Sequence, residues 1–215
     1  MLKINESFAS IQGESSHAGV PCFFIRLAGC NLSCTYCDTV PAKSFDAGCD
    51  TSVQQLVDAA KASGLKLVEI TGGEPLAQAE TPELCKKLLA AGFEVMIETN
   101  GSLDINTLPD KVIRVVDFKT PSSGEANRML NSNYTRLRPR DEVKFVISGR
   151  EDYLFAMRMI SKFSLASQTQ NLLISPITGR MQPAEIVRWI IADKAPVRLN
   201  LQLHKIIWGP NAIGV

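Results

Sequence analysis

The sequence predicts an α/β fold, an open and partial (β/α) barrel of about six parallel strands. Short apolar runs rich in Val, Ile and Phe alternate along the chain with segments of helical spacing, which is typical of a parallel sheet covered by helices. The runs are mostly apolar, as expected for strands that are buried on both faces. About six such units in 215 residues are too few for a closed barrel of eight strands, which needs about 250 residues.

The order of the elements follows from these runs. The predicted strands are 22–27, 65–71, 93–98, 112–119, 142–148 and 171–175, and the predicted helices are 52–62, 82–90, 151–163 and 183–192. Thr51 and Thr81 are suitable N-caps, and Gly64 and Gly92 lie where two helices should end. Because no long linker or low-complexity tract interrupts this order, we expect a single domain over residues 1–215.

The composition excludes several classes of partner. The chain has 23 basic and 22 acidic residues and a net charge of +1, and neither sign forms a run that would follow a nucleic acid or an anionic bilayer. No stretch of about 18 apolar residues and no signal-peptide pattern occurs, so we expect no membrane partner and a cytoplasmic location. In that reducing compartment the six cysteines should stay free or bind metal.

Three cysteines lie close together just after the first predicted strand. Cys30, Cys34 and Cys37 have the spacing Cys-x3-Cys-x2-Cys, so their thiolates can converge on one metal centre. Three ligands are one fewer than a structural zinc site or an ordinary [4Fe–4S] cluster takes, which leaves one metal position open for an incoming ligand. A zinc site completed by a distant histidine or cysteine is the alternative at this point, although Cys22 and Cys85 are more typical of core residues.

The cysteine spacing resembles the signature of the radical S-adenosylmethionine (SAM) superfamily. This resemblance implies a barrel of the radical SAM type and a [4Fe–4S] cluster in which the three cysteines bind three irons, while the fourth iron binds SAM. Reduction of the sulfonium would then release a 5′-deoxyadenosyl radical that removes a hydrogen atom from the substrate. Because the cofactor carries this chemistry, we assign no catalytic residue beyond the cluster ligands.

A glycine-rich turn follows the second predicted strand. Gly72 and Gly73 leave backbone groups uncovered and allow a ligand to approach closely. In the superfamily this turn binds the amino group of SAM, so the resemblance assigns Gly72, Gly73 and Glu74 to cofactor binding. Polar residues also follow later strands: Lys119 is expected to pair with the SAM carboxylate, and Ser175 is a fainter candidate of the same kind.

Four further segments narrow the family. They read NESFASIQGE at 5–14, FIRLAGC at 24–30, CDT at 37–39 and TGGEP at 71–75. Together they resemble the 7-carboxy-7-deazaguanine synthases over roughly residues 5–124, with weaker support from QLHK at 202–205. The resemblance implies conversion of 6-carboxy-5,6,7,8-tetrahydropterin to 7-carboxy-7-deazaguanine with loss of ammonia, on the route to queuosine and other deazapurines. It also implies Mg²⁺, a reductant such as flavodoxin or ferredoxin, and a homodimer.

The resemblance assigns the remaining contacts position by position. The pterin would be bound by Ile11, Gln12, Gly13, Arg26 and Thr71. Arg26 would hold the substrate carboxylate, because a guanidinium offers two parallel donors. Thr39 would give a hydroxyl oxygen to Mg²⁺, which binds few protein oxygens and keeps its other positions for substrate and water. From the residues alone, Arg26 equally fits an interior ion pair and Thr39 a helix cap.

Two other functions stay open on the sequence. A glycyl-radical-enzyme activase is another small radical SAM protein, and its partner would be a large enzyme instead of a pterin. A non-catalytic protein would use Cys30, Cys34 and Cys37 to bind zinc structurally. The segment 12–14 and Thr39 favour an enzyme that acts on a small molecule, which is the interpretation we adopt.

Overall fold

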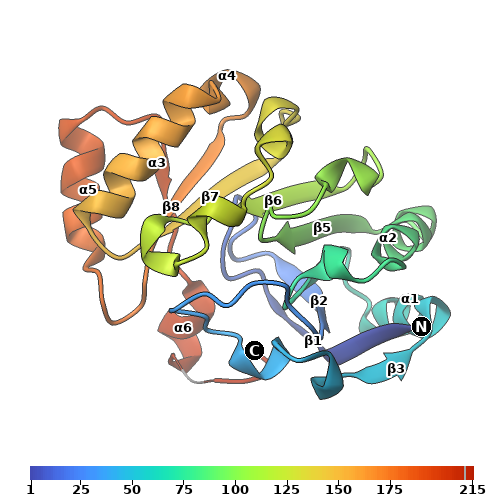
Figure 1. Ribbon diagram of the computed structural model, residues 1–215. Coiled ribbons are helices and arrows are strands. Elements are labelled where there is room, and N and C mark those ends of the chain that lie inside the picture. Colours follow the sequence, from blue (N-terminus) through green and yellow to red (C-terminus); the bar gives the residue numbers. More distant parts are fainter. Residues whose placement is uncertain (211) are drawn as a thin grey trace.

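The computed structural model describes residues 1–210 and 212–215, and its strands form a curved, open sheet of nine (Figure 1). The strands are β1 Leu2–Ile11, β2 Pro21–Leu27, β3 Cys49–Thr51, β4 Leu67–Gly72, β5 Glu94–Thr99, β6 Ile113–Asp117, β7 Glu142–Ile147, β8 Asn171–Pro176 and β9 Arg198–Leu199. Their order is β3-β1-β2-β4-β5-β6-β7-β8-β9; β1 is antiparallel to both of its neighbours, β3 and β2, and the pairs from β2 to β9 are parallel. The predicted fold class is confirmed.

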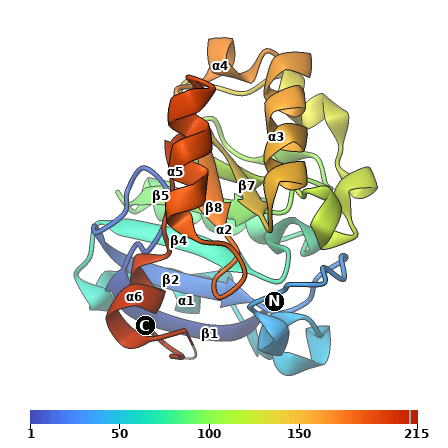
Figure 2. The same ribbon diagram turned by 90° about the vertical axis from the view of Figure 1, so that its left-hand side faces the viewer.

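Most helices lie along the outer side of this sheet. The helices are α1 Val53–Ser63, α2 Thr81–Ala90, α3 Arg150–Lys162, α4 Leu165–Gln168, α5 Pro183–Ala192 and α6 Leu203–Trp208. Figures 1 and 2 show α3 and α5 packed beside β7 and β8, with α6 set apart from them near the carboxyl end of the chain. None of the helices in the described part of the chain is long and apolar enough to cross a bilayer.

Helix ends agree with the local sequence in most places. Ser52, one residue after the predicted cap Thr51, is the N-cap of α1: its hydroxyl accepts a hydrogen bond from the Gln55 N–H at 3.2 Å. The Gln55 side chain accepts one from the Ser52 N–H at 2.9 Å, which completes a capping box. Thr81 is the first residue of α2, so its predicted cap role is wrong. Gly64 ends α1 with a φ of 68°, as predicted.

The two faces of the sheet carry different side chains. The outer face joins the helices in a large apolar core, to which Ile25, Val68 and Ile97 belong. The inner face carries a smaller apolar cluster, formed by Cys22, Phe24, Leu67, Met96, Ile113 and Val115 with Phe8 packed against it. Because this cluster fills the inner face near the amino ends of the parallel strands, ligand space remains toward their carboxyl ends, where such folds place their sites.

The loop between β1 and β2 is attached to the amino ends of β5 and β7. Ser16 donates hydrogen bonds to the buried Glu142 carboxylate from its backbone N–H at 3.0 Å and its hydroxyl at 2.5 Å. The ring nitrogens of His17 lie 3.7 Å from carboxylate oxygens of Glu142 and of Glu94. The interaction with Glu142 raises the pKa of His17, burial opposes it, and Glu94 adds to the rise.

Replacing His17 with Gln is expected to remove a pH-dependent contribution to stability. Because the folded pKa of His17 is raised above its unfolded value of about 6.5, the stabilisation is complete below that value and is lost as the pH rises through the folded pKa. The free energy of unfolding should therefore differ between wild type and His17→Gln by about 0.5 kcal/mol more near pH 5.5 than near pH 8.5. Urea denaturation at both pH values measures this, and a difference that grows toward alkaline pH would contradict it.

Candidate active site

The carboxyl ends of the parallel strands open into a cavity of about 610 Å³. The loop that follows β2 forms one wall, α6 and residues 212–215 contribute another part of the lining, and inward side chains of β2, β4, β5, β6 and β7 form the floor. This volume is within the usual range for sites that bind small molecules and cofactors.

The three clustered cysteines reach this cavity. Cys30, Cys34 and Cys37 line it and are half-buried, and burial raises the pKa of the Cys30 and Cys34 thiols. Cys30 Sγ accepts hydrogen bonds from the Leu32 N–H at 3.5 Å and from Asn100 Nδ2 at 3.9 Å. Hydrogen bonds to cysteine sulfur are a feature of iron–sulfur sites, where they adjust the reduction potential. The residues present therefore fit a cluster.

The same thiols are not preformed for a single ion. Within residues 1–210 and 212–215, no three His, Cys, Asp or Glu side chains are arranged so that they could hold one metal ion. Zinc requires its ligands to converge on one point, whereas in a [4Fe–4S] cluster each thiolate binds a different iron. Three thiols that line one cavity match this requirement of a cluster.

Hydrogen bonds hold the cysteine loop against the segment that follows β6. Thr35 donates its N–H to Ser123 O at 3.0 Å and its hydroxyl to Ser122 O at 2.7 Å, and the Ser33 N–H donates to Glu125 at 2.8 Å. Figure 1 shows the blue loop beside this yellow-green segment. The position of the thiols thus depends on residues that come 87 and 92 positions later in the chain.

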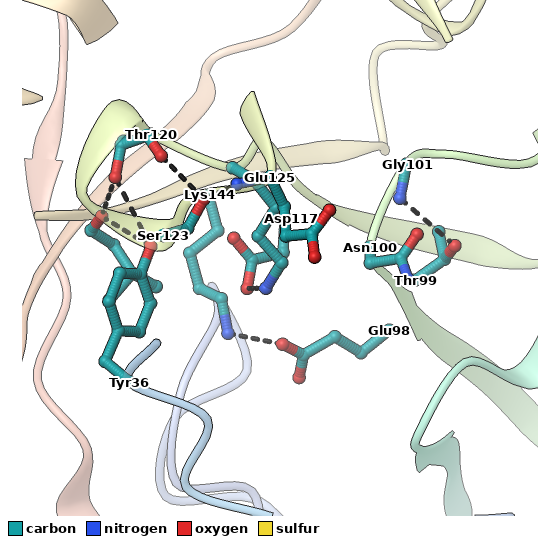
Figure 3. A network of polar contacts seen from close by, with 12 residues as sticks. Tyr36, Glu98, Thr99, Asn100, Gly101, Asp117, Thr120, Ser123, Glu125 and Lys144 are labelled. Atoms are coloured by element: carbon teal, nitrogen blue, oxygen red, sulfur yellow. Dashed lines mark hydrogen bonds and ion pairs between the residues drawn. The ribbon is translucent and has the colours of Figure 1, made fainter. Parts of the chain in front are cut away.

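Tyr36, between the second and third cysteines, points toward the end of β7 (Figure 3). Its hydroxyl lies 3.4 Å from Val146 O and 3.3 Å from Thr120 Oγ1. Burial raises the pKa of Tyr36 to about 12, so the hydroxyl stays protonated and can donate a hydrogen bond to these oxygens. This contact anchors the backbone between Cys34 and Cys37.

The glycine-rich turn after β4 packs directly against the cysteine loop. A Cβ at Gly72, whose φ is +138°, would lie 2.0 Å from Leu27 O, and a Cβ at Gly73 would lie 2.2 Å from Gly29 O. The Gly73 N–H donates to Leu27 O at 3.0 Å, and both glycines line the cavity. Glycine is therefore required here because the turn packs closely against the loop. This requirement differs from the expected one, in which glycine allows a ligand to approach.

Two of the predicted cofactor contacts lie outside the cavity lining. Glu74 is fully buried, and its carboxylate accepts hydrogen bonds from Thr99 Oγ1 at 2.7 Å and from the Asn100 N–H at 2.6 Å. Ser175 is also buried, and its hydroxyl accepts a hydrogen bond from Asn200 Nδ2 at 2.9 Å. Protein groups thus bind both side chains, and the cofactor contacts of Glu74 and Ser175 stay predictions.

Lys119 lies on the cavity wall near the cysteines. Its ammonium forms an ion pair with Asp117 at 2.8 Å. Burial lowers the pKa of Lys119, but the charges of Asp117 and Cys34 raise it by more, so the ammonium stays protonated. Asp117 Oδ1 is buried without a hydrogen-bond partner among the described residues. An anionic ligand group at this wall would share the ammonium with Asp117.

The residues expected to contact the substrate lie on another part of the lining. Ile11, Gln12, Gly13, Arg26 and Thr71 all border the cavity. Arg26 and Thr71 are register partners on the adjacent strands β2 and β4. Arg26 Nε also forms an ion pair with Glu6 at 2.7 Å. Arg26 is therefore both part of an ion pair and a guanidinium on the cavity lining.

Thr39 borders the cavity where the cysteine loop enters a short helix, η1 (Val40–Ala42). Its backbone oxygen accepts from the Ala42 N–H at 3.0 Å, but its side chain makes no capping hydrogen bond. Instead the hydroxyl lies 3.2 Å from Asp38 Oδ1, and Lys205 Nζ approaches the other oxygen of Asp38 at 2.6 Å. Hydroxyl and carboxylate oxygens are the donors that Mg²⁺ prefers, so Thr39 fits the expected ligand type.

The sequence prediction assigned no individual role to four charged residues on the floor of the cavity. Glu14, Glu69, Glu98 and Lys144 line it, and Lys144 Nζ forms ion pairs with Glu14 at 2.8 Å and with Glu98 (Figure 3). Burial opposes the charge of Lys144, but the two carboxylates raise its pKa well above the ordinary value. A signal existed in the sequence, because Glu69, Glu98 and Lys144 each interrupt or end an apolar run in which a charge is costly.

Replacing Lys144 with Met is expected to lower the free energy of unfolding by about 2 kcal/mol, because two partly buried carboxylates lose their common, buried partner. The loss should shrink toward acidic pH, since Glu14 and Glu98 can then take up protons. Adding Glu98→Gln should recover part of it, whereas Lys86→Met on the exposed side of α2 should change stability by less than about 0.5 kcal/mol. Urea denaturation of these variants measures the effect, and equal losses in the Lys144 and Lys86 variants would refute the argument.

Comparison with known proteins identifies the family. Residues 24–119 match the Radical SAM superfamily. The chain is 38% identical over 228 residues to the 7-carboxy-7-deazaguanine synthase of Koribacter versatilis, with 100% of both chains covered. It is 40% identical over 219 residues to that of Clostridium acetobutylicum, with 99% of each covered. The crystal structure of QueE from Escherichia coli has the same fold, with a TM-score of 0.78 at 24% identity over 94% of each chain.

These full-length matches decide between the interpretations that the sequence left open. Neither a glycyl-radical-enzyme activase nor a structural zinc protein accounts for identities of 38% and 40% with synthases. The superfamily match also implies a [4Fe–4S] cluster and SAM as cofactors. The chain is an enzyme that belongs to the 7-carboxy-7-deazaguanine synthase family of the radical SAM superfamily.

Proposed function

We propose that the chain converts 6-carboxy-5,6,7,8-tetrahydropterin to 7-carboxy-7-deazaguanine with loss of ammonia, and that Mg²⁺ assists the reaction. One observation carries the proposal: a single cavity has the three thiols on one wall and Arg26 with Thr71 on another. A radical formed beside the thiols must meet its substrate before it meets solvent, and a shared cavity allows this. The relatives' name supplies the product.

The thiol wall would hold the cofactors. Cys30, Cys34 and Cys37 would bind the [4Fe–4S] cluster, which with SAM would supply the 5′-deoxyadenosyl radical that abstracts hydrogen. Gly72 and Gly73 expose backbone groups on the cavity lining, where the amino group of SAM would bind. Lys119 holds a protonated ammonium near Cys34 for an anionic group such as the SAM carboxylate.

The opposite lining would orient the substrate. Glu6 engages Nε of Arg26, which leaves the other guanidinium N–H groups for the substrate carboxylate. The end of β1, residues 11–13, and the hydroxyl of Thr71 would then border the ring system. These residues bind and orient; the proton and electron transfers depend on the bound cofactors.

Thr39→Val is expected to raise the Mg²⁺ concentration needed for half-maximal turnover by at least about tenfold, because it removes the hydroxyl oxygen and keeps the shape. Thr39→Ser should restore most of the Mg²⁺ response. The measurement is a Mg²⁺ titration of turnover in metal-depleted buffer. The assignment would be wrong if the valine variant kept the wild-type Mg²⁺ response, or if wild type needed no Mg²⁺.

The test of the proposed function is anaerobic turnover of iron–sulfur-reconstituted protein with reductant, SAM, Mg²⁺ and 6-carboxytetrahydropterin, followed by mass spectrometry. The expected result is 7-carboxy-7-deazaguanine together with 5′-deoxyadenosine. Cleavage of SAM without a deazapurine would retain the superfamily chemistry and refute the substrate. Flavodoxin or ferredoxin is the reductant we expect in the cell, and a homodimer the expected assembly, which analytical ultracentrifugation tests.

We infer that the product enters the synthesis of queuosine or another deazapurine. The inference follows from the carboxyl group that the product retains, which further enzymes can convert. The test expresses the chain in a strain that lacks the activity. This step would be supported if deazapurine-modified RNA or nucleoside accumulated only when the expressed chain is active. Restoration by an inactive Cys34→Ala chain would refute it.

A further inference from the structure

Glu69 is a buried carboxyl group, one oxygen of which receives no hydrogen bond from the described part of the chain. It lies on β4, lines the cavity and is 3% exposed. Its Oε2 is buried and has no hydrogen-bond partner among the described residues. A buried polar group in this state is costly, and such groups are normally hydrogen-bonded. The described neighbours of Glu69 therefore do not explain why this oxygen is buried.

The neighbours of Glu69 suit a flat ligand. Phe24 is its register partner on β2, and the rings of Phe24 and Phe8 are stacked with centroids 5.2 Å apart. These rings belong to the apolar cluster below the cavity floor. The ammonium of Lys144 is already paired with Glu14 and Glu98. Glu69 thus combines an unpaired carboxyl with an adjacent aromatic surface.

The register relates Glu69 to Arg26. Arg26 pairs with Thr71 on β4, and Glu69 lies two residues before Thr71 on the same face of that strand. With strands about 4.8 Å apart and a rise of about 3.3 Å per residue, the two positions are separated diagonally by about 8 Å. Both side chains line the same cavity, so one ligand can contact both of them.

The opposite edge of a pterin matches a carboxylate. In the lactam form it presents two adjacent donors, the ring N3–H and the 2-amino group. A carboxylate has two oxygens that accept such a parallel pair, as with guanidinium groups. Burial, Glu98 and Glu14 raise the pKa of Glu69, while Lys144 and Arg26 oppose this rise. Two N–H donors of a bound ligand would favour the ionised carboxylate, as Lys144 and Arg26 do.

We propose that Glu69 determines specificity for the 2-amino and N3–H edge of the pterin, while Arg26 holds the carboxylate at the other end of the molecule. This proposal rests on the proposed function, because it requires a carboxypterin in the cavity. It assigns Glu69 a binding role for the pyrimidine half of the substrate. A ring with oxygen at the 2-position would place an acceptor against the carboxylate and be rejected.

The test compares two stable probes, 6-carboxypterin and 6-carboxylumazine, in which oxygen replaces the 2-amino group. Each is titrated by calorimetry into anaerobic, reconstituted protein with SAM and Mg²⁺ but without reductant, so that no turnover occurs. Wild type should bind the pterin at least about tenfold more tightly. Glu69→Gln, in which an NH2 donor group replaces one acceptor oxygen, should lose this preference, whereas Glu69→Asp should bind more weakly but keep it. Glu94→Gln, at an exposed position on β5, should behave as wild type.

The outcomes separate this inference from the proposed function. Arg26→Gln should weaken both probes alike and leave the preference unchanged, because both carry the same carboxylate. If Glu69→Gln kept the wild-type preference while wild type still formed the deazapurine, the role of Glu69 would be refuted and the proposed function would stand. If wild type bound neither probe and formed no deazapurine, both would fail. Melting curves of the Glu69 variants confirm that the compared proteins are folded.

Discussion

Cys34→Ala protein, reconstituted anaerobically with iron and sulfide, is expected to bind almost no iron and to form no 7-carboxy-7-deazaguanine. Cys34 is one of three thiols on the cavity wall, and the described lining offers no fourth cysteine that could replace it. A cluster that loses one of three protein ligands keeps too few bonds to stay attached. Cleavage of SAM should therefore disappear together with the product. Iron analysis, the visible spectrum and mass spectrometry measure the three effects.

Two other cysteines provide matched controls for this experiment. Cys49 is exposed on β3, outside the cavity lining, so Cys49→Ala should leave iron content, stability and turnover close to wild type. Cys85 is fully buried in α2, so Cys85→Ala should lose about 1 kcal/mol of stability and keep its iron. Cys34→Ala should instead lose its iron and keep its stability. If Cys34→Ala protein kept a normal iron content, or if all three variants lost iron equally, the assignment of Cys34 as a cluster ligand would be refuted.

The parallel strands were predictable because burial on both faces gives each strand a continuous apolar run. The predictions for β2 and β4 to β8 agree with the structure within two residues at each end. β1 was missed although it has ten residues, because it is apolar at Leu2 and Ile4 and then mixed up to Ile11. Its later residues face the cavity or solvent, so they lack the periodicity of a strand. β3 and β9 have three and two residues, too few for any pattern.

The candidate site was predictable where its residues are contiguous in the sequence. The cysteine loop and the segment 71–75 are local motifs, and the structure brings the three cysteines and residues 71–73 to one cavity. The ion pairs of Lys144 were not predictable, because they join residues 130 and 46 positions away and require the register of several strands. The hydrogen bonds of Glu74 were not predictable for the same reason, because its donors, Thr99 and Asn100, come from the end of the neighbouring strand.

Gly73→Ala is expected to reduce turnover by at least about 100-fold, although it adds a single methyl group. The new Cβ would lie 2.2 Å from Gly29 O and 2.8 Å from Ala42 O, both of them backbone atoms. Gly29 is bonded to Cys30 and donates its N–H to Ala42 O at 2.8 Å, so relief of the clash must displace the first cluster ligand. Overpacking of this kind should also lower the free energy of unfolding by about 2 kcal/mol.

The matched control for Gly73→Ala is Gly149→Ala, because Gly149 has an extended backbone and no atom within 4 Å of its ideal Cβ position. That variant should remain within about 0.5 kcal/mol of wild-type stability and keep its turnover. Iron content, urea denaturation and anaerobic turnover are measured for both variants side by side. If Gly73→Ala lost activity but kept full iron and stability, the defect would lie in SAM binding at the exposed backbone. If it behaved as Gly149→Ala does, the contact between turn and cysteine loop would not position the thiols.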